Sequence, residues 1–300
     1  MPELMECVPN FSEGRRQEVI DQIVEAVRLP GARLLDVQSD EDHNRSVLTL
    51  VGEPEPLSEA AYRAIAAATR LIDLNQHQGE HPRVGATDVV PFIPLKGATM
   101  AKAVEVAHHL GDRVAETLDI PVYFYEEAAT REDRHNLERV RRKGFEELRD
   151  QIAAVEERAP DLGPRQVHPT AGAVIIGARG PLIAYNIYLN TADLKVAKAI
   201  AKSVRHSSGG LRYVKALGLD IPARGQVQVS MNLTNFRKTA LATVFNLVRD
   251  EAATYGVNIT ESEVVGLVPM DALTDAARHF LRLHDLRDEQ VLEMRLLQEG

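Results

Sequence analysis

The chain has 300 residues, 44% of them hydrophobic and 26% charged, which is the composition of a globular protein with one large or two smaller domains. A formal net charge of −9 argues against nucleic acid as a partner. One cysteine, Cys7, excludes an internal disulfide and fits a reducing compartment. Because the N-terminus lacks a signal-peptide pattern and no apolar run reaches membrane-spanning length, we expect a cytoplasmic protein with no membrane partner.

In the first half of the chain, short apolar runs predict strands, and apolar residues at helical spacing predict helices. The expected strands are residues 5–11, 33–37, 46–51, 89–95 and 121–125, and the expected helices are residues 15–27, 56–74 and 99–118. Ser12 could cap the first helix or contact a substrate, and Cys7 should be a buried structural thiol in the first strand. Residues 130–149 are so rich in charge that we expect a solvated helical face there.

The second half repeats this order after a connection at residues 159–171 that contains proline and glycine. Strands are expected at residues 174–188 (one bent strand or a pair), 213–219, 226–233 and 257–267, and helices at residues 191–205, 237–255 and from about 269. Strand, helix, strand, strand, helix, strand is the split βαβ unit. We therefore predict an α+β protein with two α/β subdomains, residues 1–172 and 173–300. Each would hold a mixed sheet of ferredoxin-like type with helices on its outer face, and a ligand cleft would lie between them.

A polar loop precedes the strand at residues 89–95 and carries several titratable side chains. His77 and His81 lie four residues apart, but Gly79 and Pro82 interrupt the spacing, so the two rings need not share a face and a zinc site is disfavoured. One histidine acting as a general acid or base is the functional interpretation. A loop histidine that binds backbone groups is the alternative, and the residues alone leave both open.

Two other turns hold candidate residues. Asn10, at the end of the first strand, fits either ordinary turn chemistry or contact with a substrate. Arg45, at the start of the strand at residues 46–51, could bind a substrate carboxylate through two hydrogen bonds, or form a surface ion pair.

Four separated segments resemble, in order, the motifs of the glutamate formimidoyltransferase family. They are CVPNFSEG at residues 7–14, GEHPRVGATDVVPFIP at 79–94, DLGPRQVHPTAGAVIIGAR at 161–179 and VVGLVPMDAL at 264–273. The resemblance covers essentially all of the chain. It implies the monofunctional form of a family that in vertebrates is the N-terminal part of formimidoyltransferase-cyclodeaminase.

The resemblance implies a one-carbon transferase of histidine degradation. It would transfer the formimino group from N-formimino-L-glutamate to N5 of tetrahydrofolate, its co-substrate, without a metal. In the motif Glu-His-Pro-Arg the histidine, here His81, would be the catalytic acid and base. The residues expected to contact substrate or folate are Gly163, Pro164, Arg165, Gln166, Val167, His168, Pro169, Thr170, Ala171, Gly172, Asn10, Arg45, Glu80, Arg83 and Asp88. The glycines would let the backbone approach folate closely, and Asp88 or Glu80 would steady the cationic amidine.

Other functions in the same family of folds stay open. The donor could be formiminoglycine or 5-formyltetrahydrofolate, or the chain could bind folate without catalysis, although the complete motif around His81 speaks against that. A metal-dependent hydrolase is the remaining alternative. The resemblance further implies a homodimer with small-molecule substrates, and a separate cyclodeaminase that acts on the product.

Overall fold

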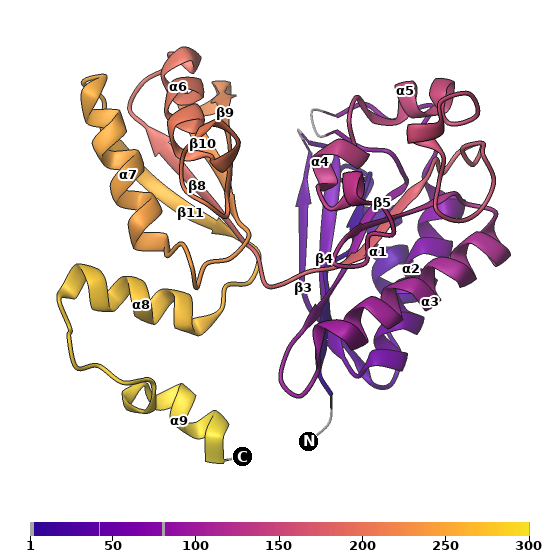
Figure 1. Cartoon of the computed structure of the whole chain (residues 1–300), viewed down its shortest axis with the longest axis horizontal. Helices are drawn as coiled ribbons and strands as arrows, with labels where there is room; N and C mark the ends of the chain where they lie inside the picture. The colour runs from indigo at the N-terminus through magenta and orange to yellow at the C-terminus, as the bar shows by residue number, and fades with distance from the viewer. Residues whose placement is uncertain (1–2, 42, 80–81, 300) are drawn as a thin grey trace. The chain divides into compact units, whose positions relative to one another are not determined.

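The computed structural model describes residues 3–41, 43–79 and 82–299, which form two compact units (Figure 1). The first unit is Met1–Gly180 and the second is Pro181–Gly300. The division falls after Gly180, whereas the boundary expected from the sequence falls after residue 172. The difference arises because residues 174–188, expected as one bent strand or a pair, form a pair whose members belong to different sheets.

The first unit contains a mixed sheet of seven strands. They are β1 (Met5–Cys7), β2 (Asn10–Phe11), β3 (Ala32–Asp40), β4 (Arg45–Gly52), β5 (Thr87–Pro94), β6 (Val122–Glu126) and β7 (Val174–Ala178). Strands β1 and β2 both lie between β4 and β5, so they are two pieces of one strand that is interrupted before Asn10. Strand β3 flanks β4, and β7 lies between β5 and β6 with all three parallel.

Three long helices cover one face of this sheet (Figure 1). They are α1 (Gln17–Ala26), α2 (Pro54–Leu71) and α3 (Met100–Leu118), followed by the shorter α4 (Leu137–Val140) and α5 (Gly144–Gln151). Cys7 has no exposed surface, and burial raises the pKa of its thiol, which confirms a structural cysteine. The interrupted strand β1–β2 and the elements α1, β3, β4, α2 and β5 form the predicted split βαβ unit. Helix α3 and strands β6 and β7 extend it.

The second unit is a four-stranded antiparallel sheet with the strand order β11-β8-β10-β9. Its elements are β8 (Ile183–Leu189), α6 (Leu194–Val204), β9 (Val214–Ile221), β10 (Gln226–Leu233), α7 (Leu241–Thr254), β11 (Ile259–Val265), α8 (Met270–Leu281) and α9 (Leu292–Glu299). Helices α6 and α7 pack on each other and on the sheet, as α8 packs on α7. This is the ferredoxin-like order, and it confirms the architecture predicted for this half.

Short 3-10 turns connect several elements. They are Glu132–Arg134, Glu156–Arg158, His206–Ser208, Pro222–Arg224 and Asp288–Gln290. No helix in the described part of the chain is long and apolar enough to cross a bilayer.

Two local predictions are wrong. Ser12 does not cap α1, because the cap position is Arg16 and it makes no side-chain cap bond. The charged stretch at residues 130–149 is not one solvated helix. Lys143 and Gly144 adopt positive φ and separate α4 from α5, and Phe145 is buried in the core of the unit. The apolar residues of this stretch are few but correctly spaced to pack against the core, and the abundance of charge hides that pattern.

Candidate active site

A small pocket lies where three neighbouring strands meet a loop. Phe11 is the last residue of β2, Arg45 is the first of β4 and Asp88 is the second of β5, so all three lie at one end of the sheet. The pocket is lined by Phe11, Ser12, His43, Asn44, Arg45, His77, Arg83 and Asp88. The empty space at this site, counted with the part that is open to solvent, is about 180 Å³. Three of these residues, Arg45, Arg83 and Asp88, are candidates from the sequence.

The polar turn after β2 is fixed by buried hydrogen bonds. The Ser12 hydroxyl donates to the carbonyl of Gly85 at 2.7 Å, and the Ser12 amide donates to Ala86 at 2.9 Å. The Ser46 hydroxyl donates to the carbonyl of Glu13 at 2.6 Å. Ser12 therefore joins the turn to the loop that precedes β5, which replaces the capping role expected for it.

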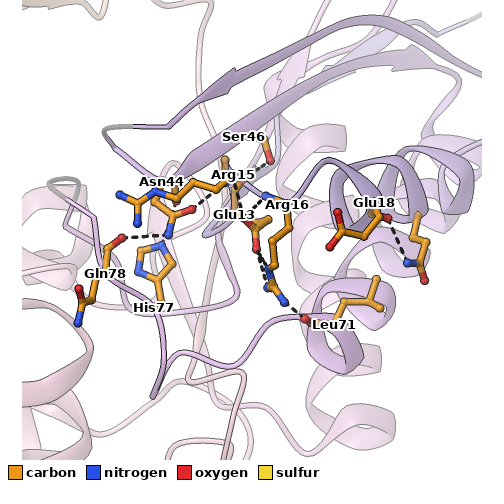
Figure 2. Close-up of polar contacts among 11 residues, drawn as sticks. Glu13, Arg15, Arg16, Glu18, Asn44, Ser46, Leu71, His77 and Gln78 are labelled. Atoms are coloured by element: carbon orange, nitrogen blue, oxygen red, sulfur yellow. Dashed lines mark hydrogen bonds and ion pairs between the residues drawn. The ribbon is translucent and has the colours of Figure 1, made fainter. Parts of the chain in front are cut away.

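Glu13 anchors the start of α1 from inside the protein. Its carboxylate accepts the backbone N–H groups of Arg15 and Arg16, both at 2.9 Å, and pairs with the Arg16 guanidinium (Figure 2). Burial acts to raise the pKa of Glu13, but these donors outweigh it, so the pKa lies below its ordinary value. The carboxylate thus holds in place the two residues that lead into α1.

His77 and Asn44 form the opposite wall of the pocket. Nε2 of His77 lies 2.9 Å from the carbonyl oxygen of Asn44, and Figure 2 shows the two residues side by side. The Asn44 side chain accepts from the amide of Gly14 and donates to the carbonyl of Gln78, each at 2.9 Å. Asn44, which adopts a φ of 47°, thus connects the β3–β4 turn to both flanking segments.

Asp88 is buried and holds two segments together. One carboxylate oxygen accepts the amide of Val84 at 2.8 Å, and the other pairs with Arg141 at 2.8 Å. Burial raises the pKa of Asp88, while Arg141, the Val84 amide, Arg45 and Arg83 act in the opposite direction. Both oxygens therefore have protein partners, so Asp88 holds the loop in its conformation without a bound substrate.

Three arginines lie near the Asp88 carboxylate. Arg141 pairs with it directly, and Arg45 and Arg83 line the pocket that Asp88 also lines. Burial lowers the pKa of Arg45, and Arg141 acts in the same direction. Arg83 pairs with Glu146 at 2.8 Å and donates to the carbonyl of His77 at 3.2 Å. Guanidinium groups arranged around a shielded pocket favour an anionic ligand.

The segment expected to bind folate lies against the same loop. The amide of Leu74 donates to the carbonyl of Thr170, and the amide of Ala86 donates to the carbonyl of Ala171, both at 2.8 Å. Two motifs that are far apart in the sequence are thereby joined. Residues 163–172 themselves do not line the pocket.

The two glycines of this segment are fixed by the chain itself. Gly163 and Gly172 have φ of 82° and 72°, where a side chain is strained. A Cβ atom on Gly172 would collide with the carbonyl oxygen of Val84, and one on Gly163 would crowd that of Ile120. Packing alone therefore requires both glycines, and close approach to folate stays a prediction.

The other predicted residues of the segment lie in ordinary surroundings. Nδ1 of His168 accepts the amide of Ala171 at 3.0 Å, and burial lowers the pKa of His168. Arg165 forms an exposed ion pair with Glu156 at 2.8 Å. Outside the segment, the Asn10 side chain donates to the carbonyl of Val8 at 2.9 Å and does not line the pocket.

Three further residues bear on the site: Glu80 and His81, which the sequence predicts, and Arg141, which it does not. Glu80 and His81 lie outside the described residues, although His77 and Arg83 on either side of them line the pocket. Arg141 was missed, because it belongs to a stretch that looks uniformly solvated. Within residues 3–41, 43–79 and 82–299, no group of three or more His, Cys, Asp or Glu side chains is arranged to hold a metal ion.

Comparison with known proteins covers both units. Residues 4–179 match the formiminotransferase domain, N-terminal subdomain, and residues 184–297 match the formiminotransferase domain. The chain is 46% identical to a glutamate formimidoyltransferase of Streptococcus pyogenes over 99% of this chain and 100% of the relative. It is 47% identical to a glutamate formimidoyltransferase of Thermoplasma acidophilum over 98% of this chain and 97% of the relative. A formimidoyltransferase-cyclodeaminase of Sus scrofa is 44% identical over 95% of this chain and 54% of its own length. The chain belongs to the formiminotransferase family.

Proposed function

We propose that this chain is a glutamate formimidoyltransferase, which transfers the formimino group of N-formimino-L-glutamate to N5 of tetrahydrofolate. The products are 5-formiminotetrahydrofolate and L-glutamate. The observation that carries the proposal is the end-to-end similarity, at 46% and 47% identity, to two relatives of that name. The pocket supports it, since its arginines suit a substrate that carries carboxylates.

The reaction moves two protons, one from N5 and one to the glutamate nitrogen, while both nitrogens are bonded to the same carbon. N5 attacks the amidine carbon and forms a C–N bond, and N5 then gives up its proton. The C–N bond to the glutamate nitrogen breaks, and that nitrogen takes up a proton as it leaves. One histidine can accept the first proton and return it in the second step. We assign this role to His81, which the resemblance implies and which stands four residues after His77 in the sequence.

The donor is expected to enter the pocket, and the folate to reach it from outside. The empty space of the pocket, counted with the part that is open to solvent, is about 180 Å³. The smaller of the two substrates, formiminoglutamate, therefore suits the pocket better than folate does. We propose that Arg45 binds one of its carboxylates, and that residues 163–172, which are hydrogen-bonded to the same loop, contact the folate.

Arg83 and Asp88 act mainly on the loop in this proposal. Arg83 is held between Glu146 and the carbonyl of His77, and Asp88 between Val84 and Arg141. Preorganised supports of this kind keep reacting groups in position. Contact of Asp88 or Glu80 with the amidine is part of the proposal, as are the homodimer, the cytoplasmic location and the separate downstream cyclodeaminase.

A donor panel tests the function. Purified protein is given tetrahydrofolate with formiminoglutamate or with formiminoglycine, and separately 5-formyltetrahydrofolate with glutamate, and product is quantified against a protein-free control. We expect kcat/KM for formiminoglutamate to exceed that for formiminoglycine by about 100-fold, because glycine lacks the side-chain carboxylate. Protein that binds tetrahydrofolate but transfers only from another donor would contradict the proposed substrate.

A further inference from the structure

The proposed mechanism uses His81 and gives no role to the other histidine of the loop, His77. His77 lines the pocket, and the carbonyl oxygen of Asn44 lies 2.9 Å from its Nε2. A carbonyl oxygen only accepts hydrogen bonds, so Nε2 must carry the proton. In the neutral ring this leaves a lone pair on Nδ1.

Nδ1 of His77 is buried and has no hydrogen-bond partner among the described residues. Buried polar atoms in folded proteins are nearly always paired, so an unpaired acceptor at a pocket requires an explanation. Hydrogen bonds also hold the backbone that carries the ring. The carbonyl of His77 accepts from Arg83 at 3.2 Å, and the next carbonyl, that of Gln78, accepts from Asn44 at 2.9 Å.

The charges around the ring keep it neutral. Burial lowers the pKa of His77, and the nearby guanidinium groups of Arg83 and Arg15 lower it further. The Asn44 carbonyl and the Glu13 carboxylate act in the opposite direction and do not outweigh these effects. At neutral pH the ring therefore presents a fixed acceptor rather than a cation.

We propose that Nδ1 of His77 accepts a hydrogen bond from an N–H group of the donor's amidine and so orients the amidine carbon for attack. This inference rests on the proposed function. The amidine offers N–H donors, whereas the carboxylates of the same molecule would be repelled by the lone pair and are better placed at Arg45. No proton is transferred to His77, so the acid and base steps remain with His81.

A purely structural histidine is the competing explanation, and one substitution separates the two. In His77→Gln the side-chain amide places an N–H donor near the position of Nε2, so the bond to Asn44 can persist while the acceptor at Nδ1 is lost. His77→Ala loses both. His108→Gln is the matched control, because Nε2 of His108 makes the same kind of bond, at 2.8 Å to the carbonyl of Ala128, on α3 and outside the pocket lining.

We expect His77→Gln to keep the thermal midpoint of the wild type and to lose at least about tenfold in kcat/KM for formiminoglutamate, with KM for tetrahydrofolate unchanged. His108→Gln should match the wild type in all three. Full kcat/KM in a folded His77→Gln protein would overturn the inference, since a structural histidine predicts that result.

A second measurement uses the wild type and does not depend on the variants folding. NMR of nitrogen-labelled imidazole groups should show His77 protonated at Nε2, with a bare Nδ1 whose resonance moves on saturation with formiminoglutamate. An unchanged Nδ1 resonance in donor-saturated protein would overturn the inference. Wild-type protein without transfer activity would instead overturn the proposed function, and the same titration would still decide the role of His77.

Discussion

The two units share the split βαβ order but differ in what they bury. The described part of the first unit buries four charged side chains, Glu13, Asp88, Arg134 and Arg158. In the described part of the second unit the buried polar side chains are uncharged, namely Asn186, Gln228, Thr239 and Thr274. Among the residues that the structure describes, this topology therefore closes around its apolar core there without a buried charge.

The buried charges of the first unit therefore serve something other than the topology. Removing a charge from water is expensive, and well-packed apolar residues would usually stabilise a fold as well or better. Asp88 lines the pocket, and Glu13 follows Ser12, which lines it too. Arg134 pairs with Asp161, and Arg158 donates to the carbonyl of Val140 at 3.1 Å, next to Arg141, the ion-pair partner of Asp88. Folded proteins usually avoid burying charge, and exceptions to such rules are most often found at functional sites.

The largest expected difference is in the free energy of unfolding, which Asp88→Ala should lower much more than Glu263→Ala. Asp88→Ala leaves the half-buried Arg141 without its partner and the Val84 amide without its acceptor, and breaking a pair of this kind typically costs about 3 to 5 kcal/mol of unfolding free energy. Glu263 is exposed on the sheet of the second unit, where it accepts from Asn186 and Tyr188, and its loss should cost about 1 kcal/mol. Chemical denaturation followed by circular dichroism measures both. Equal costs would refute the contrast between the units.

A pair of glycines provides the next largest effect. Gly172→Ala adds a Cβ where φ is 72° and the carbonyl of Val84 leaves no space, so we expect a loss of about 3 kcal/mol. Gly256→Ala, at a φ of 67° with nothing within 4 Å, should cost about 1 kcal/mol from backbone strain alone. The same denaturation experiment compares them. If both losses were alike, crowding against the loop would not matter.

The smallest effect concerns acid stability and Glu13. Its pKa is lowered in the folded protein, so its carboxylate stabilises the fold above the unfolded pKa of about 4.5 and loses that contribution as pH falls through the folded value. Glu13→Gln should cost about 1.5 kcal/mol at neutral pH and flatten the fall in stability below about pH 4.5. Glu18→Gln, on the exposed side of α1, is the control. If the stability of Glu13→Gln fell at acid pH as steeply as that of the wild type, Glu13 would not be the group responsible.

The sequence predicts the elements well, because apolar periodicity reports burial directly. It also singles out Arg45, Asp88 and the loop motif. It does not predict Arg141, since the partner of a buried carboxylate fifty residues away leaves no local pattern. The role of Ser12 was missed for a related reason. A serine before a helix has the local chemistry of a cap, and the carbonyl of Gly85 competes for its hydroxyl only in the folded chain.

The most direct test of the account is transfer from formiminoglutamate to tetrahydrofolate by the wild type and by His81→Ala, with folate binding and thermal unfolding measured for both. The account predicts that His81→Ala folds, binds folate with unchanged affinity and transfers about 10²- to 10⁴-fold more slowly, because it lacks the group that moves both protons. A His81→Ala protein that transfers at the wild-type rate would contradict it.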